Sequence, residues 1–208
     1  MCPPTYFDVE YSINPWMDVE NRVDRDLAFR QWHAFVDLLL ELGDSVQFIE
    51  PVPGLPDMTF AGDAGLVWKR QFVPSNFRHP QRQAESRHYS DWLRRQSFDI
   101  SPMPPDVLFE GLGDVVFHGQ RAFVGYGPRS DERAFSYLQE LIPDLEMVGR
   151  LEIVDDRYFH LAMALAFDMC TPALRAELAD AGYDVVTCDM SEFKKGGGSL
   201  RCLVLTTL

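Results

Sequence analysis

The sequence predicts an α/β fold made of repeated units arranged around a centre. Short runs rich in β-forming residues alternate with amphipathic helix patterns along the chain. One order of elements, strand–strand–helix–strand, occurs over residues 58–102 and again over 107–155. A third copy joins a C-terminal strand pattern at 200–206 to the patterns at 7–49. Because repeated supersecondary units pack around a common axis, we expect a propeller-like α/β architecture.

Apolar stripes and helix end signals predict four helices. The first covers residues 24–42 and ends at Gly43, and the second covers 80–95. We expect Ser130 to cap a third helix that runs to about residue 142, and Thr171-Pro172 to begin a fourth that Gly182 ends. The expected strands cover residues 7–11, 45–49, 58–68, 71–74, 98–102, 107–118, 121–126, 151–154, 159–167, 183–187 and 200–206.

The fourth repeat is incomplete. Its first strand, at 159–167, should precede a second strand, a helix and a third strand, but the chain passes directly to the helix at Thr171. Because even a minimal βαβ unit takes about 30 residues, we expect one unit of roughly 40 residues to be absent between Phe167 and Thr171. The segment is either deleted or left out of the structure, and a compact four-unit ring is the alternative. An omitted segment would produce a Cα step well above about 3.8 Å between 167 and 172.

Composition and charge limit the possible functions. A chain of 208 residues that is 46% hydrophobic can bury one substantial core, and we treat residues 1–208 as one domain. The net charge of −13 argues against a nucleic-acid-binding protein but allows a cationic substrate such as a guanidinium. The four cysteines lack metal-binding spacing, and no signal peptide or membrane-spanning run is visible. We therefore expect a reduced, cytoplasmic protein that does not bind membranes.

Two residues near the C-terminus are candidates for nucleophilic catalysis. Cys202 follows three consecutive glycines, which let backbone approach a ligand closely, and a cysteine in that setting is a candidate nucleophile. His160 can supply the proton that a departing amine needs. Each residue alone is more often part of a core: Cys202 as a small apolar side chain, and His160 as a buried histidine with its hydrogen bonds satisfied.

Carboxylates recur in two similar segments. Glu110 and Asp114 lie in LFEGLGDVVF, and Asp57 and Asp63 lie in PDMTFAGDAGLVW, each set interrupted by small residues before an apolar strand. Buried carboxylates need a cation, and a planar guanidinium with five N–H donors matches them. A solvated turn is the alternative for either segment. Arg129 could bind a substrate carboxylate or could be a surface residue at a helix start.

Five motifs, in this order, carry a family resemblance: DMTFAGDAGLV, FEGLGDVVF, GYGPRSD, FHL and GGGSLRCL. Over nearly its whole length the chain resembles the guanidino-group-modifying superfamily of arginine deiminases, dimethylarginine dimethylaminohydrolases (dimethylargininases) and amidinotransferases. The superfamily fold is the pentein, a five-bladed α/β propeller of ββαβ units. The sequence shows three whole units and two halves, and His160 and Cys202 are too close together for an intact member.

The resemblance implies roles for particular residues. Cys202 would be the nucleophile, His160 the proton-transfer partner and Glu110 the acid that contacts both histidine and guanidinium. Asp63 would bind the guanidinium. The dimethylargininase pattern also implies substrate contacts from Asp57, from the pocket-lining Phe60, and from Arg82 and Arg129 on the side of the substrate carboxylate. No metal or organic cofactor is implied.

Departures from the family pattern bear on the subtype. Deiminases and amidinotransferases carry aspartate where this chain has Ala162, whereas dimethylargininases typically have lysine there. Dimethylargininases carry glutamate where this chain has Gly62, and the acidic motif has one residue more than usual between Glu110 and Asp114. The opening segment resembles the branch that includes arginine dihydrolases, but that branch has asparagine in place of Asp63.

The resemblance implies a dimethylargininase-like hydrolase that converts arginine or a methylated arginine into citrulline and an amine or ammonia. Arginine deiminase, dihydrolase and amidinotransferase activities are alternatives. So are a non-catalytic pentein that keeps the pocket and a ribosome-associated translation or assembly factor. The expected partner is a small guanidino compound, and a homo-oligomer is possible.

Overall fold

The computed structural model describes residues 1–155, 157–165, 172–182 and 185–207. A first ββαβ unit contains β1 (Gly65–Trp68), β2 (Gln71–Pro74) and β3 (Asp99–Ile100). β1 and β2 pair antiparallel, and β3 pairs parallel with β2 after the chain passes through α2 (Pro80–Gln83) and α3 (Glu85–Arg95). The expected repeat at 58–102 is therefore confirmed, although the single helix expected over 80–95 is divided at Ala84.

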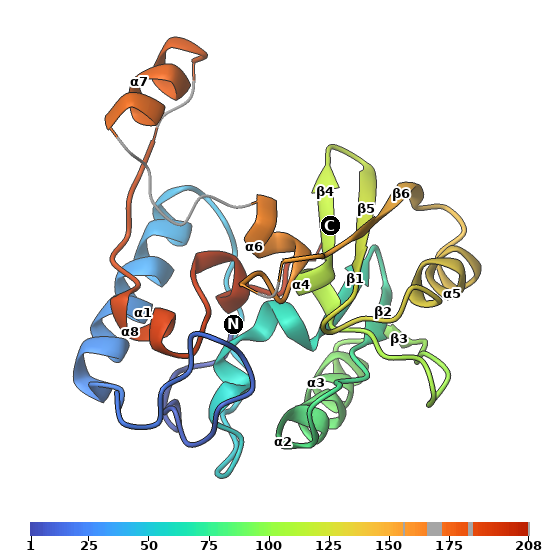
Figure 1. The fold of residues 1–208 in the computed structure, drawn as a ribbon, viewed down its shortest axis with the longest axis horizontal. Helices are drawn as coiled ribbons and strands as arrows, with labels where there is room; N and C mark the ends of the chain where they lie inside the picture. The colour runs from blue at the N-terminus through green and yellow to red at the C-terminus, as the bar shows by residue number, and fades with distance from the viewer. Residues whose placement is uncertain (156, 166–171, 183–184, 208) are drawn as a thin grey trace.

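The second unit repeats this topology beside the first (Figure 1). β4 (Val115–His118) pairs antiparallel with β5 (Arg121–Tyr126), and β6 (Glu146–Glu152) pairs parallel with β5 after α5 (Ala134–Leu141). In each sheet the strands lie side by side in their order along the chain, β1-β2-β3 and β4-β5-β6. The repeat expected over 107–155 is thus confirmed as well.

Both first strands are shorter than the sequence predicted. Residues 58–68 begin with two 3₁₀ turns, η1 (Pro56–Thr59) and η2 (Ala61–Ala64), and extended backbone starts only at β1. Residues 107–118 begin with irregular backbone and the short α4 (Gly111–Asp114), and β4 starts at Val115. In each unit a tight turn of small residues places a buried carboxylate, Asp63 or Asp114, just before the strand.

The expected third unit packs together without forming a sheet. Helix α1 (Arg25–Glu41) starts where Asp24 accepts a hydrogen bond from the Leu27 N–H, close to the expected start. The strands predicted at 7–11, 45–49 and 200–206 are wrong, since those segments are irregular or, in η3 (Leu200–Leu203), form a 3₁₀ turn. They nevertheless share an apolar cluster that includes Phe7, Trp32 and Leu203.

The chain after residue 155 departs most from the prediction. Helix α6 (Leu161–Leu165) occupies the predicted strand at 159–167, and residues 185–187 form no strand. Helix α7 (Pro172–Asp180) stands apart from the body of the molecule, and a short helix that the sequence did not predict, α8 (Ser191–Lys195), follows it (Figure 1). Residues 166–171, where the absent unit and the long Cα step were expected, lie outside the described residues.

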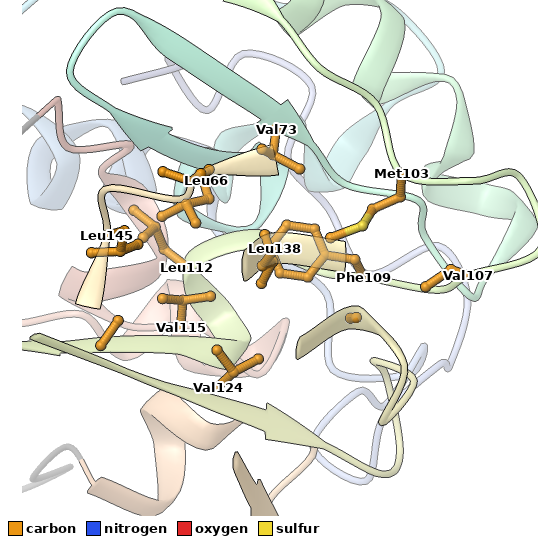
Figure 2. Packing of buried hydrophobic residues seen from close by; sticks show 13 residues of the cluster. Leu66, Val73, Met103, Val107, Phe109, Leu112, Val115, Val124, Leu138 and Leu145 are labelled. Atoms are coloured by element: carbon orange, nitrogen blue, oxygen red, sulfur yellow. The ribbon is translucent and has the colours of Figure 1, made fainter. Parts of the chain in front are cut away.

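One core joins the two units. Leu66 and Val73 of the first unit pack with Val115 and Val124 of the second and with Leu138 of α5 (Figure 2). This contact holds the starts of β1 and β4 side by side. No helix within the described part of the chain is long and apolar enough to cross a membrane. The described residues form a mixed α/β fold with two complete units, and no closed ring is seen among them.

Candidate active site

His160 lies at the centre of a buried cluster of carboxylates. It precedes α6 and is 1% exposed. Its Nδ1 lies 3.4 Å from Asp114 Oδ1, which also accepts the Leu161 N–H at 3.0 Å. On the other side of the ring, Nε2 lies 3.6 Å from Glu110 Oε2 and 4.0 Å from Asp63 Oδ2. The segments before β1, β4 and α6 therefore meet at this imidazole.

These carboxylates change the acidity of His160. Burial alone would lower the pKa of the imidazole, but the nearby charges of Asp114 and Asp63 and the contact with Asp114 outweigh it, so the pKa lies above its ordinary value. Asp114 is itself held in place, because the Ser130 hydroxyl donates to its Oδ2 at 2.6 Å. Protonated His160 is thus favoured, as a proton donor to a leaving amine requires.

Two glycines allow the segments to approach this closely. A Cβ at Gly113 would lie 2.5 Å from Nδ1 of His160, and the ring therefore packs directly on backbone. Gly111 has φ of +52°, and a Cβ there would lie 2.6 Å from the Gly65 backbone nitrogen of the first unit. Any larger residue at either position would separate the carboxylates that meet at His160.

Arg82 is held by the carboxylates of the first unit. Its Nη1 donates to Asp63 Oδ2 at 2.8 Å, while Nε and Nη2 donate to the two oxygens of Glu85 at 3.0 and 2.9 Å. The guanidinium also lies 4.5 Å from the centre of the Phe77 ring. Burial raises the pKa of Glu85 to about 7, although Arg82 opposes that shift. Arg82 and both carboxylates are almost completely buried.

Arg129 forms the equivalent pair in the second unit. Its Nη1 donates to Glu110 Oε2 at 2.9 Å, Nη2 donates to the Ile13 carbonyl at 2.9 Å, and the guanidinium lies 4.9 Å from the centre of the Phe159 ring. The sequence predicted that Arg82 and Arg129 face a substrate carboxylate. In the structure, the two guanidinium groups bind the carboxylates Asp63 and Glu110, which were expected to contact a substrate guanidinium.

Cys202 lies in η3 beside a narrow pocket of about 10 Å³. The pocket brings together most of the predicted site residues; it is lined by Ile13, Asn14, Met17, Asp57, Phe60, Asp63, Arg82, Arg129, Phe159, Gly196, Gly197, Gly198 and Cys202. Burial raises the pKa of the Cys202 thiol to about 12, and the charge of Asp63 adds to this effect. Positive charge nearby would have the opposite effect on the thiol.

Three buried polar atoms around this site have no hydrogen-bond partner among the described residues. They are Asp57 Oδ1, Asp63 Oδ1 and His160 Nε2. The other oxygen of Asp57 accepts the Tyr11 hydroxyl at 2.9 Å, and burial raises the pKa of Asp57. Unpaired acceptors in a buried site match a ligand rich in N–H donors. Within the described ranges, no three His, Cys, Asp or Glu side chains are arranged to hold a metal ion.

A second, open cavity of about 410 Å³ adjoins the same residues. It shares Asp63, Gly197, Gly198 and Cys202 with the narrow pocket. Its other lining residues are Trp16, Leu112, Gly113, Arg157, Tyr158, His160, Ala162, Met163, Lys194, Ser199, Leu200 and Arg201. Asp57, Phe60, Arg82 and Arg129 line only the narrow pocket, and Glu110 contacts His160 and Arg129 from outside both linings.

Sequence reasoning assigned no site role to Ser130, Arg201 and Tyr11. Ser130 was expected to cap a helix, but α5 begins at Ala134 and the Ser130 hydroxyl bonds Asp114 and the Glu110 N–H instead. Arg201 is the neighbour of Cys202 in sequence and could have been noticed for that reason. Nothing in the sequence connects Tyr11 with Asp57, 46 positions away.

Sequence comparison relates the chain to guanidino hydrolases. It is 33% identical to the N(G),N(G)-dimethylarginine dimethylaminohydrolase of Mycobacterium tuberculosis over 257 positions, covering 99% of this chain and 84% of the relative. It is 29% identical to the bifunctional arginine dihydrolase/ornithine cyclodeaminase ArgZ of Synechocystis, covering 99% of this chain but 37% of that protein. No family model matches the chain.

Structural comparison gives the same grouping. The crystal structure of the N-terminal domain of ArgZ, a cysteine-to-serine mutant bound to substrate, aligns with a TM-score of 0.89 at 28% identity, covering 98% of this chain and 95% of the domain. A dimethylarginine dimethylaminohydrolase adduct shares the fold, with a TM-score of 0.77 at 16% identity, covering 91% of this chain and 94% of the other.

The fold and these similarities define a hydrolase that acts on the C–N bonds of guanidino compounds. The chain belongs to the dimethylarginine dimethylaminohydrolase family within the guanidino-group-modifying superfamily. The expected family and enzyme class are therefore confirmed. The substrate and the roles of individual residues remain predictions.

Proposed function

We propose that the chain is a cysteine-dependent dimethylargininase, which hydrolyses the guanidinium group of arginine or a methylated arginine to citrulline and an amine or ammonia. One observation carries the proposal: Asp57, Asp63 and His160 each present a buried polar atom that has no hydrogen-bond partner in the described part of the chain. Two of these residues, Asp57 and Asp63, lie beside Cys202 in the narrow pocket. A planar guanidinium supplies the N–H donors that the two carboxylates lack.

In the first half of the proposed reaction, the guanidinium carbon of the substrate becomes bonded to the sulfur of Cys202. The Cys202 thiolate attacks the planar guanidinium carbon, so that an S–C bond forms and the C–N bond to the leaving amine breaks. His160 gives its proton to that amine, and the raised pKa of the imidazole favours the protonated donor. The product of this half-reaction is an S-alkylthiouronium intermediate on the enzyme.

Water completes the reaction. His160, now neutral, takes one proton from water as the oxygen bonds to the carbon. The S–C bond then breaks and the remaining hydroxyl proton passes to solvent, which releases a ureido product and restores the thiolate. Glu110 and Asp63 balance the positive charge of the substrate and the intermediate, while Asp114 acts as a positioning residue through Nδ1 of His160.

The thiol requires the charge of the substrate for its activation. Its pKa of about 12 leaves it protonated near neutral pH, and a bound guanidinium supplies the positive charge that lowers this pKa. Arg82 must then share Asp63 with the substrate. The two buried arginines retain donors that can face a substrate carboxylate, the role that the family pattern assigns to them.

Substitution of the nucleophile tests the mechanism. We expect Cys202→Ser to abolish citrulline formation without loss of folding, because a hydroxyl is a far weaker nucleophile at neutral pH. His160→Ala should lower kcat by roughly 10²–10⁴-fold. Cys188→Ser, which changes another free cysteine, serves as the matched control and should keep wild-type rates. Citrulline production by the Cys202→Ser enzyme at the wild-type rate would contradict the covalent mechanism.

Arginine dihydrolase activity is the second candidate, because the ArgZ domain aligns closely in structure. A substrate panel of arginine, monomethylarginine, dimethylarginine, agmatine and arginine plus ornithine separates the candidates by the amine released. Dimethylamine identifies a dimethylargininase, ammonia from arginine identifies a deiminase or dihydrolase, and transfer to ornithine identifies an amidinotransferase. Failure to label Cys202 selectively with a haloacetamidine, together with no turnover, would indicate a non-catalytic binding protein.

We propose in addition that the fold is a five-unit pentein from which about one unit has been lost. The alignment to the M. tuberculosis relative extends over 257 positions although this chain has 208 residues, so the relative has extra residues within the aligned range. Helix α6 begins where the repeat requires a strand. An experimental structure that shows a closed four-unit ring with ordinary chain geometry across 166–171 would contradict this proposal.

A further inference from the structure

The segment that carries the nucleophile packs on a glycine that has no part in the reaction described above. η3, which contains Cys202, contacts the turn η2, and Gly62 of η2 lies at that contact. A Cβ at Gly62 would lie 2.7 Å from the carbonyl oxygen of Arg201. It would also lie 3.2 Å from the carbonyl oxygen of Cys202 and 3.1 Å from that of Val204. The two backbones therefore meet at a distance that a residue with a side chain does not allow.

The position of Gly62 makes this contact relevant to the reaction. Asp63 is the next residue in η2, and Cys202 is one of the residues that Gly62 meets in η3. Asp63 and Cys202 both line the narrow pocket and the larger cavity. In the proposed reaction Asp63 holds the guanidinium and Cys202 attacks its carbon, so the spacing of the two residues decides whether the sulfur reaches that carbon.

The turn η2 is held firmly by its other contacts. All four of its residues are buried. The Ser75 hydroxyl donates to the backbone carbonyl of Asp63, and Nη1 of Arg82 donates to the side chain of Asp63 at 2.8 Å. A side chain added at position 62 would therefore displace η2 less readily than its neighbour.

The segment η3 has more freedom to move. It follows three consecutive glycines at 196–198, and three of its four residues are only half-buried. A backbone carbonyl cannot turn aside as the end of a flexible side chain does, so η3 would have to shift as a whole. The carbonyl oxygen of Arg201 would move from 2.7 Å to an ordinary contact of about 3.4 Å from the new Cβ, a retreat of about 0.7 Å.

We propose that Gly62 is a positioning residue for the nucleophile. The absence of a side chain there lets η3 approach η2 until Cys202 reaches a guanidinium that Asp63 holds, much as Gly113 lets His160 pack on backbone. The inference rests on the proposed function and leaves its bond changes as they are. Gly62 itself lines neither hollow, so it acts through Cys202 and not through the substrate.

Two alkylating probes of Cys202 test the proposal without a known natural substrate. 2-Chloroacetamidine carries a planar cation that Asp63 can bind as it would bind a guanidinium, whereas 2-chloroacetamide has a similar size and no charge. Mass spectrometry of the peptide 202–208 gives a second-order rate constant for each probe, and each is divided by the rate constant of the same probe with free cysteine. Because hydrogen bonds to charged groups contribute about 1.5–3 kcal/mol, wild-type Cys202 should favour the amidine by at least about tenfold.

The substitution Gly62→Ala should reduce that preference. We expect the rate constant of Cys202 with the amidine to fall by at least about tenfold, because a displacement of about 1 Å can cost roughly 10²-fold. The rate constant with the amide should change by less than about threefold, since the amide does not depend on Asp63. Gly149→Ala is the matched control: a Cβ there would lie 3.9 Å from its nearest neighbour, Phe123 Cδ1, and both rate constants should stay at wild-type values.

The outcomes separate the inference from the proposed function. An unchanged preference for the amidine in Gly62→Ala overturns the inference and leaves the proposed function intact. An equal loss with both probes, or loss of the cooperative urea transition, also overturns it, because Gly62 would then support the fold in general and not the spacing of Asp63 and Cys202. If wild-type Cys202 shows no preference for the amidine, Asp63 does not hold a cation beside the nucleophile, and both proposals are overturned.

Discussion

The two ββαβ units bury the same arginine–carboxylate arrangement with different degrees of charge compensation. Arg82 in the first unit is bound by two carboxylates, Asp63 and Glu85, whereas Arg129 in the second is bound by Glu110 and a backbone carbonyl. Both guanidinium groups stack on a phenylalanine ring. The repeated topology thus carries a repeated electrostatic arrangement.

The two units differ in which carboxylate can contact groups other than the buried arginine. In the second unit, Glu110 also lies near Nε2 of His160, so one acid serves an arginine and the imidazole. In the first unit, Glu85 takes two of the Arg82 hydrogen bonds, and one oxygen of Asp63 has no hydrogen-bond partner among the residues that the structure describes. The additional acid therefore leaves Asp63 free to contact a ligand.

Removal of the better-compensated arginine should have the largest effect. Arg82→Met leaves Asp63 and Glu85 buried without their cation, so we expect a loss of about 3–5 kcal/mol in the free energy of unfolding near neutral pH. Urea unfolding measures it. Arg94→Met is the matched control, because Arg94 pairs with Asp91 on the surface and should contribute less than about 1 kcal/mol. A loss as small as that of the control would show that the buried pair does not stabilise the fold.

Arg129→Met should cost less, about 2–3 kcal/mol, because only Glu110 loses a charged partner and His160 remains near it. The same urea experiment measures the difference between the two variants. If Arg129→Met is as destabilising as Arg82→Met, the number of carboxylates does not explain the contrast between the units.

Glu85→Gln should change how the free energy of unfolding depends on pH. The folded pKa of Glu85, about 7, lies above the ordinary value of 4.5. Below pH 4.5 the proton is bound in both states; as pH rises toward 7, the unfolded chain loses it first, so this residue makes stability fall. We expect the variant to lack a decline of about 3 kcal/mol in the free energy of unfolding between pH 4.5 and 8. Parallel stability curves for variant and wild type would contradict the raised pKa.

The repeat pattern predicted the strands of the two sheets better than it predicted the segments outside them. Hairpins and helices follow from local patterns, and the elements at 71–74 and 121–126 were predicted with their observed bounds. The strands at 7–11 and 200–206 were wrong, because an apolar run indicates burial but does not show whether a neighbouring backbone is available for pairing. A strand was also predicted at 159–167, where residues 161–165 form a helix, because an apolar run of that length does not distinguish a strand from a buried helix.

Residue chemistry indicated the components of the site but not their contacts. Cys202, His160 and the carboxylates were found from residue type and motif order. The structure places Cys202, His160, Asp57 and Asp63 around two adjoining hollows, and Glu110 and Asp114 beside His160. Sequence could not show that Asp114 faces Nδ1 or that Ser130 bonds to Asp114, since these contacts depend on how the starts of separate segments pack. No local sequence pattern indicates the volume of the larger cavity.

The packing of His160 on Gly113 also provides a spectroscopic probe. The imidazole occupies the space that a side chain at position 113 would need. The α-protons of Gly113 are therefore close to the ring and within its ring current. In an NMR spectrum their chemical shifts should be displaced from those of ordinary glycine protons. Rotation or protonation of the imidazole would move those resonances, and each step at the histidine could be followed from a backbone atom that takes no part in it.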